Sequence, residues 1–462
     1  MEEVRVIAPT GCLGYGFSRE DFARMLDEHE PDVIAVDAGS TDPGPYYLGS
    51  GQSFTTEVEV AAELDVLIAA SLERDVPLVV GSCGGAGADP HVAWTRRIVE
   101  EVAAKRGWSF RLATISAEVS RETVVGWLDD GAIGTFESEE PLTAEAVEES
   151  ICIVAQMGHE PIVEALDGGA QVVLAGRACD DAVFAALPIA RGFDVGLALH
   201  MGKILECGAL AATPVGMDVM LGTLRHDHFE LVPGSPRRAC TLTSVHGHAL
   251  YEREDPFIHI GPSGTVDLTD AVVSKVDDRR VRVRGTRYEP FDDCVVKLEG
   301  VRHSGFRSIA VAGMRCPSML SILDEILDEG LRRTRNSLAA MGVPDDSYRL
   351  ALHVYGRDGV MRGLEPRRQV AHEVGLVIEA VADEQALAHS IAHNLAGTLL
   401  HLDYPGQYNN AGNLAFPFSP AEIDAGPVFE FSIYHLARVG DPLAAFPVEY
   451  LDIGPAAGER AA

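Results

Sequence analysis

The chain has 462 residues, of which 47% are hydrophobic and 23% charged. It contains 37 Lys and Arg residues and 70 Asp and Glu residues, which gives a formal net charge of −33. This composition predicts a globular protein of two or three domains with ample core, and the acidic balance argues against nucleic acid and membrane surfaces as partners. The sequence has no apolar run of membrane-spanning length, no basic leader and no CxxC pair among its eight cysteines. We therefore expect a cytoplasmic protein with reduced thiols.

Four short apolar runs near the N-terminus are each as long as a strand buried on both faces and too short for an ordinary helix. They are VRVIAP (4–9), DVIAVD (32–37), PLVVG (77–81) and AQVVLAG (170–176). A further strand is predicted at 110–119, and helices are predicted at 18–30, 55–74, 90–106, 120–130, 144–153, 160–166, 181–187 and 196–210. This alternation predicts a parallel sheet, so we expect residues 1–214 to form a Rossmann-like α/β ligand-binding domain.

The pattern changes after residue 214. Short alternating runs separated by Gly and Asp turns predict a β-rich segment over 215–304. Residues 305–455 follow the order strand, helix, strand, strand, helix, strand, which predicts a ferredoxin-like α+β domain. Its elements are expected at 306–313, 317–340, 349–356, 373–382, 383–401 and 428–439. The irregular loop at 403–427 is unusually long for a compact domain, and we expect it to be functional.

Each of the four apolar runs leads into a loop of glycines with hydroxyl or acidic residues. Loops at the carboxyl ends of parallel strands meet at one rim of a sheet, where ligands bind. Glycine lets backbone amides approach a ligand closely, and polar side chains supply further donors and acceptors. The predicted substrate-binding residues are Thr10, Gly11, Gly14, Tyr15, Gly39, Ser40, Thr41, Ser82, Cys83, Gly84, Gly85 and Gly176, with Asn410 and Asn413 of the 403–427 loop covering the site.

Five residues are candidates for catalysis. Arg177 can clamp a carboxylate or thioester oxygen with Asp181 as general base, or the two can form a structural pair that closes the turn. Asp37 is a candidate for acid–base work, the alternative being turn chemistry alone. Glu206 lies in the apolar stretch ILECGALAA, where an acid must be paired or functional. His159 precedes a helix, where it can serve as a proton shuttle or simply as a cap.

The glycine loops do not carry the usual nucleotide signatures. The glycines of GCLGYG (11–16) have the wrong spacing for GxGxxG, and GSCGGAGAD (81–89) lacks the GK[ST] of a P-loop. Cys207, beside Glu206, is expected to be a packing cysteine because the sequence shows no histidine to activate it. We therefore predict that the protein uses no cofactor.

Two H-x-H pairs lie in the β-rich segment, His226 with His228 and His246 with His248. In a strand, a spacing of two places both imidazoles on one face, which is a geometry that zinc can use. No third ligand follows convincingly from the spacing, so no metal ligand is predicted. A metal-dependent hydrolase remains an alternative.

Several longer motifs point to one family. They are AQVVLAGRACDDA (170–182), GKILECGAL (202–210), HALYEREDP (248–256), VDLTDA (266–271), VRVRGTRYEP (281–290), VKLEG (296–300), YGRDGVM (355–361) and NNAGNLAFPFSP (409–420). With them the chain resembles the acyclic terpene utilisation AtuA family over nearly its whole length. The resemblance implies a role in the catabolism of acyclic isoprenoids or other carboxylates, beside enzymes that handle acyl-CoA thioesters. It transfers no catalytic residue.

The sequence thus predicts an enzyme of small-molecule catabolism. We expect it to act on a small carboxylate or acyl-CoA thioester by hydratase or lyase chemistry, with loop amides and Arg177 stabilising an enolate-like oxyanion. A homo-oligomer is expected. The alternative from another class is a non-catalytic binding or scaffold subunit of a catabolic complex.

Overall fold

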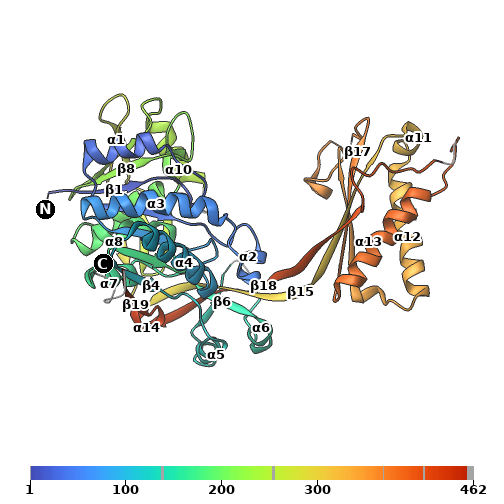
Figure 1. The fold of residues 1–462 in the computed structure, drawn as a ribbon, viewed down its shortest axis with the longest axis horizontal. Helices are drawn as coiled ribbons and strands as arrows, with labels where there is room; N and C mark the ends of the chain where they lie inside the picture. The colour runs from blue at the N-terminus through green and yellow to red at the C-terminus, as the bar shows by residue number, and fades with distance from the viewer. Residues whose placement is uncertain (1, 137–139, 252–254, 368, 409–410, 455–462) are drawn as a thin grey trace, which may run out of the picture. The chain divides into compact units, whose positions relative to one another are not determined.

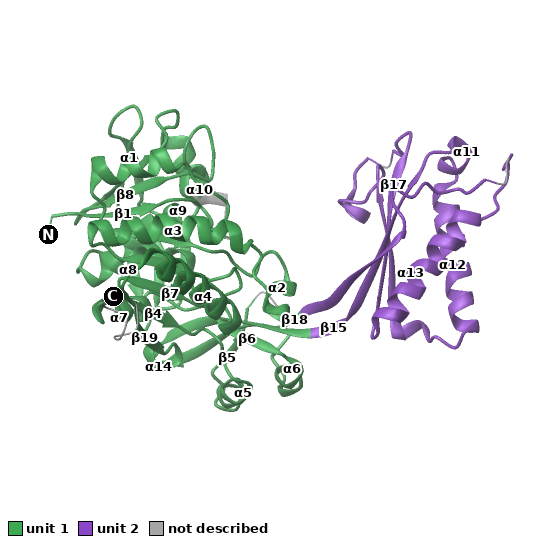
Figure 2. Ribbon diagram, in the orientation of Figure 1, with its two compact units in different colours: residues 1–302, 431–462 green, residues 303–430 purple. Residues whose placement is uncertain are grey.

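A computed structural model describes residues 2–136, 140–251, 255–367, 369–408 and 411–454 (Figure 1). The chain divides into two compact units, residues 1–302 with 431–462 and residues 303–430 (Figure 2). This division differs from the three consecutive domains expected from the sequence. The β-rich segment belongs to unit 1, and the chain returns to unit 1 after completing unit 2.

Unit 1 is a mixed α/β structure built on a ten-stranded sheet. Its strands, in spatial order, are β12 (Val272–Lys275), β13 (Val281–Arg284), β9 (Phe229–Pro233), β8 (Met220–Leu224), β1 (Val4–Ala8), β2 (Val33–Asp37), β3 (Leu78–Gly81), β7 (Val172–Ala175), β4 (Phe110–Ile115) and β19 (Val448–Ile453). The five strands from β1 to β4 run parallel to one another, and the strands on either side of them pair in antiparallel fashion. The predicted parallel strands therefore form the centre of a larger mixed sheet.

Helices cover both faces of this sheet, because the side chains of each central strand alternate between two apolar cores. One core joins Ile34 and Val36 of β2 to the first group of helices, and the other joins Val33 and Ala35 to the second group. The first group comprises α1 (Arg19–His29), α3 (Glu57–Arg74) and α4 (Asp89–Arg106). The second group comprises α5 (Arg121–Asp129), α6 (Ala144–Glu149), α7 (Glu160–Asp167), α8 (Asp180–Ala190) and α9 (Val195–Leu205). The carboxyl ends of the central strands are covered by loops rather than by these helices.

The remaining elements of unit 1 are short. They are α2 (Pro45–Ser50), the 3-10 turn η1 (Gly208–Ala211), α10 (Leu242–Tyr251), α14 (Pro442–Ala445) and a three-stranded sheet of β10 (Ile258–Gly261), β11 (Gly264–Asp267) and β14 (Arg287–Pro290). Two predicted helices are shorter than expected. The helix predicted at 144–153 ends at Glu149, and the apolar residues after it form β6 (Cys152–Ala155), which pairs with β15. The helix predicted at 196–210 ends at Leu205, because Gly208 adopts a φ of +58°.

A six-stranded sheet has the order β16-β17-β15-β18-β5, with β6 also pairing β15. Its strands are β16 (Tyr348–Tyr355), β17 (Val374–Ala382), β15 (Cys294–Met314), β18 (Glu422–Gly440) and β5 (Ile133–Thr135). The strand predicted at 306–313 is only the second part of β15, which begins at Cys294 inside the segment predicted to be β-rich. Both β15 and β18 pass from one unit into the other.

Within unit 2, the helices α11 (Pro317–Leu320), α12 (Leu323–Ala340) and α13 (Gln385–His401) pack against the sheet around a core of their own. Along the chain the order is strand, helix pair, strand, strand, helix, strand, and the short 3-10 turns η2 (Asp345–Ser347) and η3 (Arg362–Leu364) lie between elements. The irregular loop after α13 ends at Ala421, six residues before its predicted end at 427, because β18 starts at Glu422.

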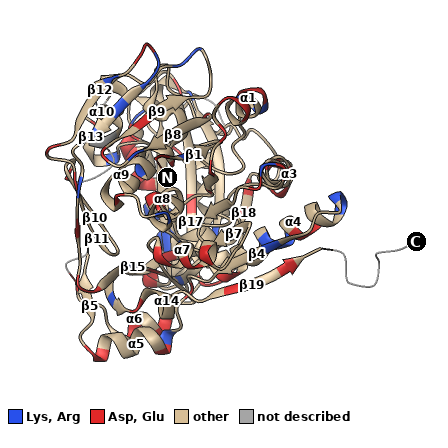
Figure 3. Cartoon of the chain, turned by 90° about the vertical axis from the view of Figure 1, so that its left-hand side faces the viewer, with Lys and Arg blue, Asp and Glu red and all other residues tan. Residues whose placement is uncertain are grey.

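Acidic and basic residues are interspersed on the helices of unit 1 (Figure 3). Arg97 and Arg106 of α4 form ion pairs with Glu57 and Asp65 of α3, so some of the excess negative charge is neutralised locally. Exposed pairs of this kind contribute little to stability. Among the described residues, no helix combines the length and apolar character needed to cross a membrane.

Candidate functional site

The four rim loops meet at one edge of the ten-stranded sheet. The amide of Leu13 in the first loop donates to the carbonyl of Asp37 at 2.9 Å. Ser82 in the third loop donates through its amide to Gly176 at 3.1 Å, and the amide of Arg177 in the fourth donates to Gly87 at 3.0 Å. Loops that are far apart in the sequence are therefore held together by their own backbones.

Small residues are required where these loops touch. A Cβ on Gly87 would lie 2.2 Å from the backbone nitrogen of Arg177, and Gly87 has a φ of +68°. A Cβ on Gly39 or Gly85 would lie within 2.5 Å of the Phe54 ring. Phe54 therefore packs on the second and third loops at once, and its ring also contacts Tyr15 of the first loop at a centroid distance of 5.9 Å.

Asp37 is the last residue of β2 and is 5% exposed. Its Oδ2 accepts the amide of Gly39 at 3.1 Å, whereas its Oδ1 has no hydrogen-bond partner among the residues that the structure describes. Burial raises the pKa of Asp37 to about 7, and repulsion from Asp180 adds to the rise, while Arg177, the Gly39 amide and Ser82 oppose it. A carboxyl group of this kind can change its protonation state near neutral pH.

Ser82, in the third loop, interacts with Asp37 and lowers its pKa. It is completely buried and has a φ of +41°, a left-handed conformation that costs a non-glycine residue about 1 kcal/mol or more. Its hydroxyl oxygen accepts the amide of Ala178 at 3.4 Å. Backbone strain of this kind is found preferentially where a side chain must be aimed at a site.

Arg177 is bound inside the protein rather than exposed at the rim. Its Nε donates to Glu299 Oε2 at 2.8 Å, and Glu299, on β15, is fully buried. Lys297 Nζ lies 2.7 Å from Glu299 Oε1, and the Thr41 hydroxyl donates to the same oxygen at 2.8 Å. Burial opposes ionisation of Glu299, but Arg177 and Lys297 hold its pKa at about 2. The group therefore has two cations on one carboxylate and a local excess of positive charge.

A second polar group lies where α8 and α9 meet. Lys203 Nζ of α9 contacts Asp180 Oδ2 at 3.1 Å and Glu206 Oε1 at 2.8 Å. The Cys207 thiol donates to the same Glu206 oxygen at 3.2 Å. A Cβ on Gly11 would lie 2.9 Å from the Cys207 carbonyl oxygen, so the first rim loop packs on this segment. Asp180 links the group electrostatically to Asp37.

Of the predicted catalytic residues, the structure brings Asp37, Arg177 and Glu206 into this connected set and leaves two apart. His159 and Asp181 line a separate small cavity of about 20 Å³ with Tyr288 and His259. His159 Nε2 lies 3.9 Å from Glu160 Oε1. The partner of Arg177 is Glu299, not Asp181, so the pair expected from the turn is replaced by one across the fold.

The predicted binding residues are distributed as follows. Gly14 and Tyr15 line an open pocket of about 350 Å³ with Phe54, Thr55, Thr56, Glu59 and Met217. The Thr10 hydroxyl is buried without a partner in the described chain, and Ser40 donates to Asp42 at 2.8 Å. Cys83 is fully buried, which raises the pKa of its thiol to about 12, and Gly84 and Gly176 fit closely against His91 and Ala117.

The asparagines expected to cover the rim belong to unit 2. The Asn413 amide nitrogen donates to the carbonyls of Leu399 at 3.1 Å and Leu402 at 2.7 Å, and so closes the end of α13. Asn410 lies outside the described residues. The prediction that His246 and His248 share a strand face is wrong, because both lie on α10, where residues two apart point in different directions.

Sequence reasoning missed Lys203 and Glu299 as members of the site. Lys203 stands three residues before Glu206 in GKILECG, a helical spacing that pairs opposite charges and could have identified it. Glu299 is 122 residues from Arg177 in the chain, and no local signal connects the two.

The family model described as acyclic terpene utilisation family protein AtuA matches residues 4–221 and 234–415. The chain belongs to the AtuA family. The resemblance found in the sequence motifs is thereby confirmed, and the family description suggests involvement in acyclic terpene utilisation. For this AtuA-family chain, no curated protein and no solved structure gave a match.

Proposed function

We propose that this AtuA-family protein is an enzyme that binds a small carboxylate or acyl-CoA thioester at the rim and transfers a proton on it, in a reaction of the hydratase or lyase type. In this proposal the ten-stranded sheet is a Rossmann-like framework for the ligand, unit 2 is a ferredoxin-like domain, and the protein forms a homo-oligomer.

The observation that carries the proposal is the carboxyl group of Asp37. It is buried at the carboxyl end of a central strand, one of its oxygens has no hydrogen-bond partner among the described residues, and its pKa is about 7. General acid–base catalysis is most effective when the pKa of the catalytic group is close to the working pH. A merely structural carboxylate would be expected to have both oxygens bonded.

The net positive charge of the Arg177, Lys297 and Glu299 group beneath the rim favours an anionic ligand. Arg177 and Lys297 carry two positive charges against the single negative charge of Glu299, whereas Lys203 is held between Asp180 and Glu206. The pocket of about 350 Å³ beside Tyr15 is large enough for a small metabolite. The Phe54 side chain lines this pocket and also packs against Gly39, which is two residues after Asp37.

In the proposed reaction these groups have different roles. In dehydration, the carboxylate form of Asp37 takes a proton from the carbon next to the carbonyl, and the loop amides stabilise the enolate oxygen that develops. Lys203 is the candidate to protonate the leaving hydroxyl. Arg177 then acts from inside the protein, as a fixed charge rather than as a direct ligand of the substrate.

The test is proton exchange in D₂O, which does not require the full reaction to be known. The whole protein is incubated with a panel of branched 3-hydroxyacyl-CoA and 2-enoyl-CoA thioesters and with the free acids, and deuterium incorporation and product formation are followed by mass spectrometry. Asp37→Asn is expected to lower the rate by about 10²–10⁴-fold. The exposed Asp452→Asn of the same sheet serves as the control and is expected to retain it.

Two results would overturn the proposal. An Asp37→Asn protein that exchanges protons at the wild-type rate would remove Asp37 from the chemistry. Tight binding of a thioester by the wild-type protein without exchange or turnover would instead support a non-catalytic binding subunit. Sedimentation analysis tests the homo-oligomer separately.

A further inference from the structure

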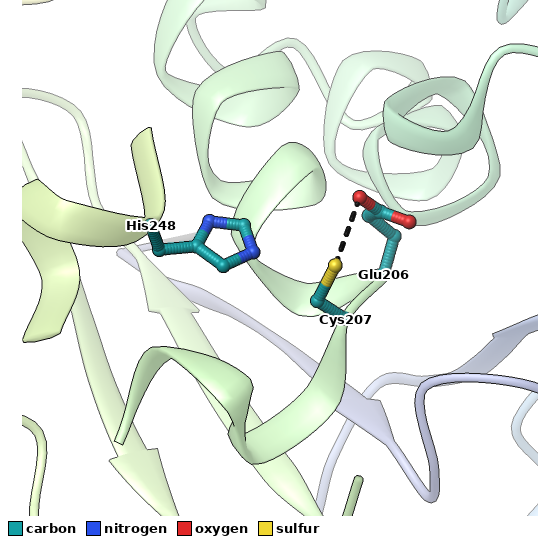
Figure 4. A group of neighbouring side chains, drawn as sticks. All are labelled: Glu206, Cys207 and His248. Atoms are coloured by element: carbon teal, nitrogen blue, oxygen red, sulfur yellow. Dashed lines mark hydrogen bonds between the residues drawn. The ribbon is translucent and has the colours of Figure 1, made fainter. Parts of the chain in front are cut away.

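Three side chains with different ligand atoms converge beside the rim. Glu206 and Cys207 follow α9 directly, and His248 lies on α10. Their ligand atoms, a carboxylate oxygen, a thiol sulfur and an imidazole nitrogen, all lie within 4.8 Å of one another. Figure 4 shows the His248 ring pointing toward the Cys207 sulfur, which in turn faces the Glu206 carboxylate.

We propose that Glu206, Cys207 and His248 form a binding site for a divalent transition-metal ion of the zinc class. This inference does not depend on the proposed proton transfer, because it concerns metal binding alone.

The donor set selects the class of metal. Sulfur and imidazole nitrogen are ligands for zinc and its neighbours in the first transition series, whereas calcium and magnesium take oxygen. Bond lengths of about 2.0–2.3 Å place tetrahedral zinc ligands about 3.5 Å apart. The Cys207 sulfur already lies 3.2 Å from Glu206 Oε1, and ligand atoms within 4.8 Å of one another need to approach by at most about 1.3 Å. Three protein ligands would leave a fourth position for water or another small ligand.

Charge supports a divalent ion. Metal binding requires Cys207 to lose its proton to solvent, after which the thiolate, Glu206 and Asp180 carry three negative charges and Lys203 one positive charge. A 2+ ion would neutralise this set. Without a metal, the Cys207 thiol keeps its proton and donates a hydrogen bond to Glu206.

The surrounding contacts resemble the outer shell of a metal site. Lys203 holds Glu206 Oε1 at 2.8 Å and is itself held by Asp180, so the carboxylate has a fixed orientation. Such outer partners orient metal ligands and tune their affinity. His248 is 4% exposed, and the helix that carries it begins with reciprocal hydrogen bonds between Thr241 and Ser244.

The experiment uses the full chain without an affinity tag, stripped with chelator and titrated with Co²⁺ and then Zn²⁺. We expect one Co²⁺ per chain and a thiolate-to-cobalt charge-transfer band, both displaced by Zn²⁺. Cys207→Ser is expected to abolish the band, and His248→Gln to weaken binding more than about tenfold. Cys316→Ser and His246→Gln are the matched controls. The first removes the thiol whose pKa is lowered by Tyr404, and the second removes an exposed histidine from the same helix.

Loss of the cobalt band in Cys316→Ser rather than Cys207→Ser would overturn the proposal, as would the absence of metal binding by the wild-type protein. Alkylation of the wild-type protein gives a reading that needs no variant to fold. Zn²⁺ is expected to protect Cys207 from iodoacetamide while leaving Cys316 reactive, and equal labelling with and without Zn²⁺ would exclude the site. Because no substrate is present, failure here leaves the assignment of Asp37 untouched.

Discussion

Replacing Glu299 by Gln tests how much the buried group of Glu299, Arg177 and Lys297 beneath the rim contributes to the free energy of unfolding. The substitution keeps the size of the side chain and removes the charge that Arg177 and Lys297 share. A pKa lowered from the ordinary 4.5 to about 2 corresponds to about 3 kcal/mol of stability at neutral pH. This agrees with the cost of about 3–5 kcal/mol for removing one partner of a buried ion pair.

The direction of the pKa shift of Glu299 determines the pH range in which this residue stabilises the fold. Because folding lowers the pKa of Glu299, its contribution is complete above pH 4.5 and is lost as the pH falls toward 2. The difference between wild type and Glu299→Gln should therefore be large at pH 7 and shrink in acid. All three tryptophans, at positions 94, 108 and 127, lie in unit 1, so their fluorescence in a denaturant titration reports on the unit that contains Glu299.

The exposed Glu289→Gln is the matched control, since it changes the same functional group outside the core. We expect the free energy of unfolding to fall by about 3 kcal/mol in Glu299→Gln and by less than about 0.5 kcal/mol in the control. A loss below about 1 kcal/mol in Glu299→Gln, or an equal loss in both variants, would refute the reasoning.

Three further predictions concern the rim and its first helix. Because folding raises the pKa of Asp37 from 3.8 to about 7, wild type loses stability as the pH rises through this range, so Asp37→Asn should be more stable than wild type in denaturant titrations at pH 8. Gly87→Ala should place a Cβ against the Arg177 backbone and lower the free energy of unfolding by more than about 2 kcal/mol, whereas Gly107→Ala, also at positive φ but with no atom within 4 Å, should lose only about 1 kcal/mol. Ser18→Ala removes the N-cap of α1 and should lower it by about 1 kcal/mol, measured in the same titration.

The sequence was sufficient to predict the strands that form the rim. Strands such as β2, with all five residues buried, can be recognised as short apolar runs, and the glycine-rich polar loop that follows each run marks the carboxyl end. Parallel order then requires the four loops to lie at one edge, which the backbone hydrogen bonds between them show. The prediction that Asp37 belongs to the rim follows from this local information alone.

Partners that come from distant elements could not be predicted in this way. The position of Glu299 is set by the pairing of β15 with β6, where Glu299 lies opposite Val154, and strand register between remote segments leaves no mark in a local pattern. The helix that carries His248 was missed for a different reason. Its start depends on hydrogen bonds between Thr241 and Ser244, a variant of the capping box that lacks the usual Glu or Gln.

The buried charges and the pKa of Asp37 are linked, and this link gives a last prediction. Arg177 lowers the pKa of Asp37, but its charge is largely balanced by Glu299. Removing that balance in Glu299→Gln would expose Asp37 to more positive charge and so move its pKa below about 7. The pH at which proton exchange reaches half its maximal rate, if Asp37 acts as the base, should then shift to lower values. Glu289→Gln should leave it in place, and an unchanged midpoint in a folded Glu299→Gln protein would show that Asp37 does not sense this group.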